Sequence, residues 1–125
     1  NIENEIFSYE KNIINLLNKS DLCITRAGAT SLAELSILNK PFIAIPLPSA
    51  KDNHQMKNAT FYKNLGCCWI LDQKNFNQDI LFNMLYKILN DNSDFLHKKS
   101  NLKKFNSQNS WNVVNQKLKE VINEN

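Results

Sequence analysis

The chain has 125 residues, a size that suits one domain burying roughly two thirds of its unfolded surface. Its formal net charge is +3. The lysines are scattered and do not form the dense basic stripe of a dedicated nucleic-acid-binding protein, so we expect no nucleic-acid partner. No apolar run approaches the ~20 residues that a membrane-spanning helix needs. The first residue is Asn rather than Met, and we expect the chain to be part of a longer polypeptide.

Three cysteines, Cys23, Cys67 and Cys68, lie in apolar runs, and none of them forms a C-x-x-C pair. An odd number with two adjacent residues indicates neither a disulfide framework nor a zinc site. We therefore expect reduced thiols in the core, no metal ion and no cofactor.

The first elements follow from the spacing of apolar residues. Apolar side chains near the helical period predict a helix from about Glu10 to Lys19, which the polar break "NKSD" ends. The short apolar run from Leu22 to Thr25 predicts a strand. After "RAGA", leucines at three-residue spacing predict a second helix, which ends at Asn39-Lys40 because Pro41 prevents its continuation.

The alternation continues along the chain. Phe42 to Ile45 is predicted to be a buried strand closed by prolines, and the loop "PLPSAKDN" leads to a helix from about His54 to Leu65 that Gly66 can cap. Cys67 to Leu71 is predicted to be a third strand. Helical patterns cover the rest of the chain, namely about Gln78 to Asn90, a weaker one around Ser93 to Phe105, and about Trp111 to Ile122.

Short apolar strands that alternate with helices predict an α/β fold, a Rossmann-like parallel sheet with right-handed crossovers and helices on both faces. Ligands of such sheets bind beyond the carboxyl ends of the strands. Three strands make a thin sheet, so we expect at least one more strand upstream. Residues 1–125 are then a partial domain, with a core of about 6–91 and a helical tail of about 93–125.

The stretch "TRAGATSLAEL" joins the first predicted strand to the next helix, where backbone N–H groups and the helix dipole favour an anion. Gly28 lets the backbone approach a ligand closely, and Thr30 and Ser31 can add hydroxyl donors. Arg26 is the only arginine of the chain, and its planar fork suits a use that lysine cannot serve.

Ser31 and Glu34 support two interpretations. They fit the S-x-x-E pattern of a capping box, in which both side chains bind free N–H groups at a helix start. A carboxylate one turn into the helix can instead accept hydrogen bonds from adjacent ribose hydroxyls. The spacing alone leaves both open.

A second polar motif, "DNHQMKNA", follows the second predicted strand at the same edge of the sheet. Asp52 or Asn53 suits the helix N-cap. His54 and Gln55, in the first turn, can bind sugar hydroxyls through an imidazole and an amide. A lone His is no evidence for catalysis, and the sequence offers no carboxylate pair, Ser-His-Asp set or metal-ligand cluster.

Together these motifs resemble the carboxyl-terminal domain of the MurG family of peptidoglycan N-acetylglucosaminyltransferases. The matching features are "SDL", "RAGATSLAE", the strand pattern P-x-I-x-I-P-x-P, "NHQxxNA" and a closing "G", in family order over about Ser20 to Leu71. The resemblance implies the carboxyl-terminal half of a glycosyltransferase B fold, the half that holds UDP-N-acetylglucosamine.

The resemblance also implies roles for individual residues. Ala29, Thr30 and Ser31 are expected to contact the diphosphate and the sugar, and Glu34 the ribose hydroxyls. Gln55, with His54 beside it, is expected to bind the hydroxyls of N-acetylglucosamine. Many family members have two glutamines where this chain has His54-Gln55. Supporting roles are expected for Arg26, Gly28 and Asn58.

Enzymes of this family are hexosyltransferases that transfer N-acetylglucosamine from UDP to lipid I, forming lipid II for peptidoglycan and thus for cell shape and division. The resemblance implies a peripheral protein on the cytoplasmic face of the bacterial inner membrane that needs no metal. The catalytic base and the lipid I site belong to the amino-terminal domain, so we expect no catalytic residue in this chain.

Three other functions fit the sequence. The chain could be a separate donor-binding subunit that acts with a partner, although such a subunit should keep the upstream strand and glycine-rich loop. A UDP-N-acetylglucosamine epimerase shares the fold but needs further catalytic acids. A non-enzymatic βαβ interaction module would bind no nucleotide.

Overall fold

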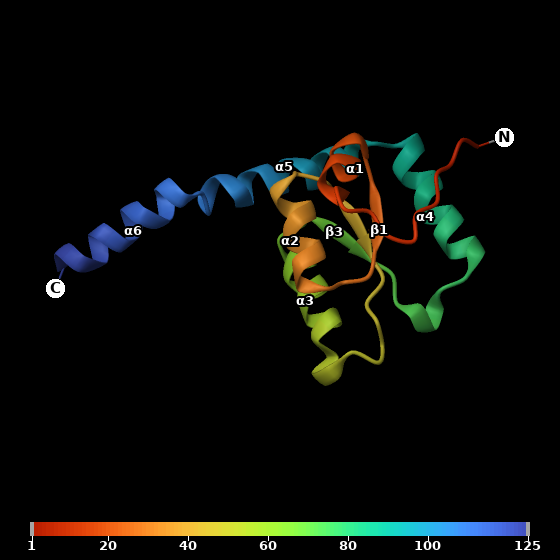
Figure 1. Ribbon diagram of the computed structural model, residues 1–125, viewed down its shortest axis with the longest axis horizontal. Helices are drawn as coiled ribbons and strands as arrows, with labels where there is room; N and C mark the ends of the chain where they lie inside the picture. The colour runs from red at the N-terminus through yellow and green to blue at the C-terminus, as the bar shows by residue number, and fades with distance from the viewer. Residues whose placement is uncertain (1, 125) are drawn as a thin grey trace.

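The computed structural model describes residues 2–124, with side chains described except at positions 111 and 124. The expected domain limits at residues 1 and 125 lie outside the described residues. Helices and strands alternate as the sequence predicts (Figure 1). In chain order they are α1 Ile13–Lys19, β1 Cys23–Thr25, α2 Ala29–Ile37, β2 Phe42–Ala44, the 3-10 helix η1 Lys51–Asn53, α3 His54–Asn64, β3 Cys68–Ile70, the 3-10 helix η2 Gln73–Asn75, α4 Gln78–Asn90, α5 Ser93–Gln108 and α6 Trp111–Glu124.

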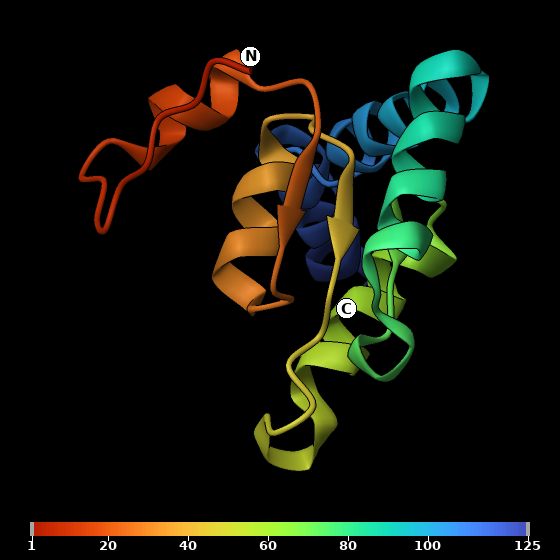
Figure 2. The same ribbon diagram turned by 90° about the vertical axis from the view of Figure 1, so that its right-hand side faces the viewer.

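The strands form a parallel sheet in the order β1-β2-β3, so the α/β prediction is confirmed. Phe42, Ile43 and Ala44 of the central strand are all fully buried, because helices cover both faces of the sheet. Figure 2 shows α2 and α4 on opposite sides of the strands, and α3 packs beside α2. All three strands therefore end at the same edge of the sheet.

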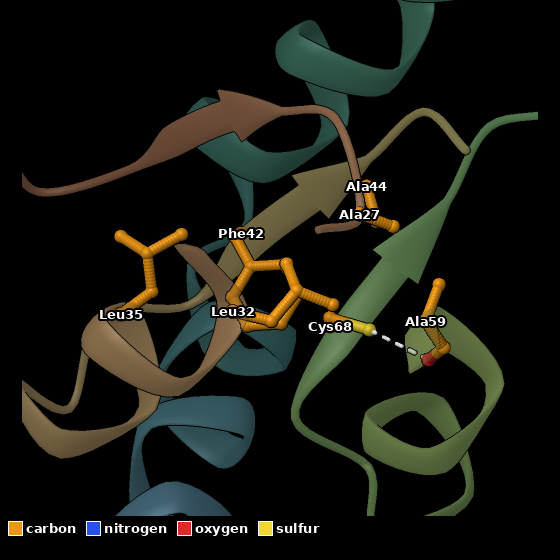
Figure 3. Close-up of a cluster of buried hydrophobic side chains, with 7 residues drawn as sticks. All are labelled: Ala27, Leu32, Leu35, Phe42, Ala44, Ala59 and Cys68. Atoms are coloured by element: carbon orange, nitrogen blue, oxygen red, sulfur yellow. Dashed lines mark hydrogen bonds between the residues drawn. The ribbon is translucent and has the colours of Figure 1, made fainter. Parts of the chain in front are cut away.

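The core between the sheet and the pair α2 and α3 is a cluster of small and large side chains (Figure 3). Phe42 lies at its centre. The rings of Phe42 and Tyr62 pack edge to face, with 5.7 Å between their centroids. The cluster includes the loop residue Ala27, which is 0% exposed. Its remaining members are Leu32, Leu35, Ala44, Ala59 and Cys68.

All three cysteines are free thiols, and Cys67 and Cys68 are buried as predicted, whereas Cys23 is only half-buried. The Cys68 thiol donates a weak hydrogen bond to the Ala59 carbonyl at 3.7 Å. Burial raises the pKa of the Cys68 thiol to about 12. Cys68 is therefore protonated at neutral pH and packs as a small apolar side chain.

Helix α1 begins at Ile13, three residues later than predicted. The Glu10 carboxylate accepts the Asn12 N–H at 2.9 Å and holds these residues in a turn before the helix. The apolar face of α1 is largely uncovered, since Ile13 and Ile14 are 42% and 40% exposed while Leu17 packs against the core. Spacing alone therefore predicted the helix but not the burial of its apolar face.

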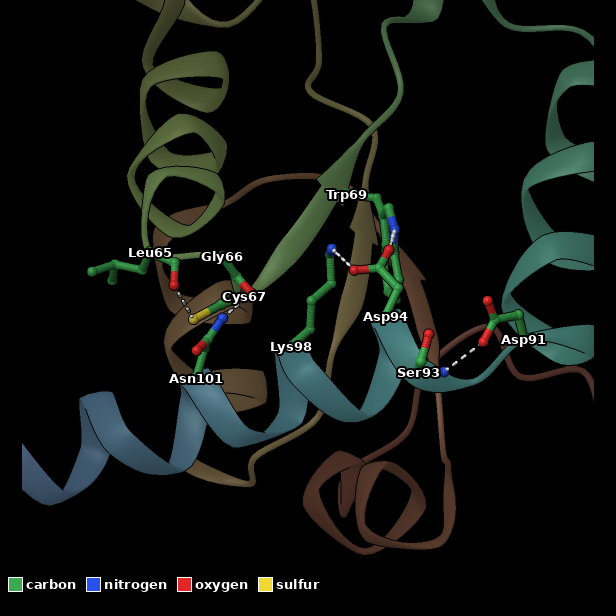
Figure 4. A network of polar contacts seen from close by, with 9 residues as sticks. All are labelled: Leu65, Gly66, Cys67, Trp69, Asp91, Ser93, Asp94, Lys98 and Asn101. Carbon is green, nitrogen blue, oxygen red and sulfur yellow. Dashed lines mark hydrogen bonds and ion pairs between the residues drawn. The ribbon is translucent and has the colours of Figure 1, made fainter.

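Helix α5 lies against the body of the domain, although the sequence predicted it as part of a tail. Leu102 is fully buried, and the Asn106 amide donates to the Ser36 carbonyl of α2 at 2.7 Å. Figure 4 shows a second attachment, in which Asp94 accepts hydrogen bonds from Lys98 and from the Trp69 indole. The hydrogen bond from Lys98 lowers the pKa of Asp94. Helix α6 extends away from the body (Figure 1).

Gly66 connects α3 to β3 with φ at +73°, a left-handed conformation that only glycine adopts at little cost. A Cβ at this position would lie 2.6 Å from Nδ2 of Asn101. The same Asn101 amide donates to the Gly66 carbonyl at 3.0 Å, so it cannot move away without losing this bond (Figure 4). The prediction of Gly66 as the residue that ends α3 is confirmed.

We expect Gly66→Ala to lower the free energy of unfolding by about 2 kcal/mol, from the left-handed backbone and the displaced Asn101 amide. Urea denaturation followed by circular dichroism measures this change. Gly28→Ala is the matched control, because Gly28 has φ of −66° and an added Cβ meets nothing within 4 Å. Equal stability losses in the two variants would contradict the interpretation of Gly66.

Candidate functional site

The candidate site is the loop from β1 into α2 at the carboxyl edge of the sheet. Gly28 is the N-cap of α2, and the first helical hydrogen bond runs from the Leu32 N–H to the Gly28 carbonyl at 3.1 Å. Within residues 2–124, the backbone N–H groups from Gly28 to Ser31 have no hydrogen-bond partner. Such unpaired donors at a helix start form an anion site.

The capping-box interpretation of Ser31 and Glu34 is wrong. Because α2 already begins at Ala29, Ser31 lies inside the helix, and no side chain caps its first turn. Glu34 is half-buried, and its carboxylate has no hydrogen bond or ion pair to any residue that the structure describes. Residues three and four apart share a helix face, so Glu34 lies on the same face as Thr30 and Ser31. Both hydroxyls and the carboxylate remain available to a ligand.

Nothing in the described part of the chain requires glycine at position 28. Its φ and ψ of −66° and 140° suit any residue, and the space where a Cβ would lie is open. Ala29, Thr30 and Ser31 beside it are exposed. The loop therefore presents bare backbone to the space in front of α2, as the sequence predicted for close approach of a ligand.

Two side chains of α3 form hydrogen bonds with the backbone N–H and the backbone carbonyl of Ala27. The side-chain oxygen Oε1 of Gln55 accepts a hydrogen bond from the backbone N–H of Ala27 at 3.1 Å. The side-chain Nδ2 of Asn58 donates to the backbone carbonyl of Ala27 at 3.0 Å. Gln55 also accepts the Leu47 N–H at 2.9 Å. We call these three hydrogen bonds the Ala27 clamp. It joins the two polar motifs, which the sequence placed only at the same sheet edge.

The clamp changes the expected role of Gln55. Its side-chain oxygen is fully used by two backbone N–H groups, so only its NH2 group is available for a sugar hydroxyl. Asn58, for which only a supporting role was expected, donates across the site to the backbone of the neighbouring loop. The residue pattern did not indicate these contacts, because the partners of Gln55 and Asn58 are backbone groups of other loops.

His54 is exposed and lies beside Asp52, with 3.8 Å between its Nε2 and the carboxylate. Asp52 and Asn53 both adopt left-handed backbone with φ near +55°. Asn53 is at the N-cap position of α3 as expected, but its side chain makes no capping hydrogen bond. His54 is therefore the first residue of α3, directly after a turn with left-handed backbone, and its exposed side chain is accessible to a ligand.

Arg26 lies at the carboxyl edge but binds residues of the other sheet face. One guanidinium nitrogen donates to the Ile45 carbonyl at 3.3 Å and to Gln73 at 2.5 Å. The arginine thus ties the end of β1 to the segments that follow β2 and β3. It lines a cleft of about 480 Å³ with Ile24, Thr25, Ile45, Gln73 and Phe76. Gln73 was missed by the sequence, although its place just after the third strand indicates this edge.

Among residues 2–124, no group of three or more His, Cys, Asp or Glu side chains is close enough to hold a metal ion. Within the same residues, no helix is both long and apolar enough to span a bilayer. The hydrogen-bond donors that the candidate site presents are backbone N–H groups, the hydroxyls of Thr30 and Ser31, side-chain amides and one imidazole.

The sequence profile of the glycosyltransferase family 28 C-terminal domain matches residues 1–114. A relative from Pelagibacter ubique, named UDP-N-acetylglucosamine--N-acetylmuramyl-(pentapeptide) pyrophosphoryl-undecaprenol N-acetylglucosamine transferase, is 50% identical over 125 residues, which is 100% of this chain and 35% of the relative. The protein of the same name from Rickettsia bellii is 35% identical over 91 residues, or 73% of this chain and 26% of that protein.

The crystal structure of Acinetobacter baumannii MurG matches this fold with a TM-score of 0.70 at 25% identity. The match covers 80% of this chain and 28% of that one. The predicted fold, the carboxyl-terminal half of a glycosyltransferase B architecture, is therefore confirmed. The chain spans about a third or less of the length of these relatives.

The Ala27 clamp predicts different stabilities for two substitutions of similar size. Gln55→Met removes the oxygen and leaves the N–H groups of Ala27 and Leu47 without their acceptor, so we expect a loss of about 2 to 3 kcal/mol in unfolding free energy. Gln55→Glu keeps an acceptor oxygen and should lose less than half as much. Urea denaturation of both variants measures the difference, and equal losses would show that the clamp does not stabilise the fold.

Proposed function

The chain belongs to glycosyltransferase family 28 as its C-terminal domain, and from this premise we propose that it forms the donor-binding part of an N-acetylglucosaminyltransferase. Its relatives carry names that include UDP-N-acetylglucosamine and a lipid-linked muramyl-pentapeptide. The proposed reaction transfers N-acetylglucosamine from UDP to lipid I and yields lipid II for peptidoglycan. The relatives named above carry transferase names, and none of them is named as an epimerase.

The observation that carries this proposal is the free start of α2 with Glu34 on the same helix face. The unpaired N–H groups from Gly28 to Ser31 suit a diphosphate, which carries negative charge and many acceptor oxygens. The Glu34 carboxylate suits the two ribose hydroxyls, both of which are donors. A ligand that carries a diphosphate next to a ribose matches both groups.

The mechanism assigned to these residues is stabilisation of the leaving group. As the bond from the sugar to UDP breaks, negative charge grows on the diphosphate, and oriented backbone dipoles stabilise it without a metal ion. The hydroxyls of Thr30 and Ser31 add donors beside them. His54 and the NH2 group of Gln55, at the start of α3, are assigned to the sugar hydroxyls.

The remaining parts of the reaction are assigned outside this chain. The base that activates the acceptor, and the site for lipid I, are assigned to an amino-terminal domain of the full-length protein. Because lipid I is held in the membrane, the enzyme is proposed to act as a peripheral protein on the cytoplasmic face of the inner membrane. Roles in cell shape and division follow from peptidoglycan synthesis.

Glu34 provides a direct test of donor binding. We expect the unsubstituted protein to bind UDP about 10- to 100-fold more tightly than 2′,3′-dideoxy-UDP, because a charged acceptor loses its two hydroxyl donors. Glu34→Ala should bind both nucleotides with similar affinity. Isothermal titration calorimetry on the gene product that carries this chain measures the four dissociation constants.

Glu120→Ala is the matched control for this titration, since Glu120 is an exposed carboxylate on α6. It should keep the preference for UDP. If the unsubstituted protein binds neither UDP nor UDP-N-acetylglucosamine at millimolar concentration, the proposed function is wrong. If it binds UDP but Glu34→Ala keeps the full preference, only the role of Glu34 is wrong.

Gly28→Ala tests the approach of the diphosphate to the loop. The added methyl group meets no protein atom within 4 Å, so the fold should be unchanged, but the methyl group occupies the space in front of α2. We expect UDP affinity to fall at least about tenfold, while urea denaturation shows a loss of no more than about 1 kcal/mol, the cost of alanine at an N-cap. Unchanged UDP affinity would place the diphosphate elsewhere.

A further inference from the structure

We propose that Asn58 is a positioning residue of the donor site, which prevents the peptide between Ala27 and Gly28 from flipping. This inference rests on the proposed function, because it concerns how the backbone N–H groups of the site are directed toward a diphosphate. The observation behind it is the hydrogen bond from the Asn58 amide to the Ala27 carbonyl at 3.0 Å.

The geometry of a peptide unit makes this bond directional. The Ala27 carbonyl and the Gly28 N–H belong to one planar trans unit, in which they point in opposite directions. Because Asn58 holds the carbonyl on the side of α3, the Gly28 N–H points away from Asn58. It is the first of the unpaired donors that lead into α2. The Asn58 amide therefore sets the direction of this donor without touching the ligand.

Gln55 cannot perform the same task. Its oxygen accepts the Ala27 N–H, which belongs to the preceding peptide unit between Arg26 and Ala27. The two side chains lie three residues apart on one face of α3, and each fixes a different peptide plane. Removing Asn58 leaves the plane after Ala27 held only by the start of α2.

The peptide unit between Ala27 and Gly28 can rotate more easily than its neighbours because one of its two residues is glycine. A peptide plane can rotate when the dihedral angles on either side of it change together, and Gly28 has no side chain to resist the change. Nothing lies within 4 Å of the position where its Cβ would be, so the surroundings do not resist it either. In the rotated state a carbonyl oxygen faces the anion and repels it.

Asn58 is also chemically suited to this position. Its amide is neutral, so it adds no charge beside a diphosphate. By accepting the Asn58 hydrogen bond, the carbonyl polarises the peptide and strengthens its N–H as a donor. Asn58 is half-buried and held within the clamp, where competition from water is reduced.

The test compares Asn58→Ala with Asn64→Ala in the gene product that carries this chain. Asn64 is the matched control because it lies on the same helix and is exposed. Calorimetry measures dissociation constants for UDP and for uridine, which lacks phosphate, at a temperature where circular dichroism shows every variant folded. We expect Asn58→Ala to bind UDP about tenfold more weakly and uridine within about twofold, while Asn64→Ala changes neither.

Two results would overturn the positioning role. One is unchanged UDP affinity in Asn58→Ala, and the other is an equal loss for UDP and uridine, which indicates general structural damage. If the unsubstituted protein binds UDP and depends on Glu34, these results leave the proposed function intact. If the unsubstituted protein binds no UDP, the proposed function fails and this inference fails with it.

Asn58→Asp keeps the test decisive if Asn58→Ala does not fold. An aspartate cannot donate to the Ala27 carbonyl, but it can accept the Gly28 N–H once the peptide has rotated. Because this new hydrogen bond protects the Gly28 N–H, its hydrogen exchange in the ligand-free protein, followed by NMR, should be at least about tenfold slower than in the unsubstituted protein. An unchanged exchange rate at Gly28 would overturn the proposal.

Discussion

The hydrogen bonds on both sides of Ala27 are the constraint on which the site depends. Ala27 belongs to the hydrophobic core by its side chain and to the candidate site by its backbone. Because its polar groups are buried, leaving them unpaired would cost about 1 to 3 kcal/mol each. The same contacts therefore stabilise the fold and fix the loop, and a change that loosens one affects the other.

This constraint exists because of the topology. In a parallel sheet every strand ends at the same edge, and right-handed crossovers place α2 and α3 on the same face. Residues 28 positions apart in the chain, Ala27 and Gln55, thus come within hydrogen-bond distance. The loop after β2 joins them through Leu47. The candidate site at this edge is therefore assembled from three segments that are not adjacent in sequence.

The sequence was sufficient for the order of elements, because continuous apolar strands and helical spacing are local signals. It was also sufficient to place "RAGATS" and "NHQMKNA" at one edge, since that follows from parallel strands. It was misleading at Ser31, where S-x-x-E matched a cap although the helix already begins at Ala29. The pattern records side-chain chemistry but not where the backbone turns.

The partners of long polar side chains could not be predicted for a different reason. Gln55 and Asn58 bind backbone groups, which every residue carries, so no residue type marks their partners. Arg26 was expected to have a supporting role in the site. It braces the strand ends on the other face through Ile45 and Gln73, and its relation to a ligand stays a prediction.

The proposed donor site handles negative charge with neutral groups. Its donors are backbone N–H groups at the start of α2, and the side chains that fix the loop, Gln55 and Asn58, carry no charge. Dipoles that are already oriented need no rearrangement when charge grows on a leaving group, so their contribution increases along the reaction. Orientation therefore matters more here than net charge. The side-chain amides of Gln55 and Asn58 on α3 supply this orientation. Arg26, the only arginine of the chain, can therefore hold the strand ends together through Ile45 and Gln73.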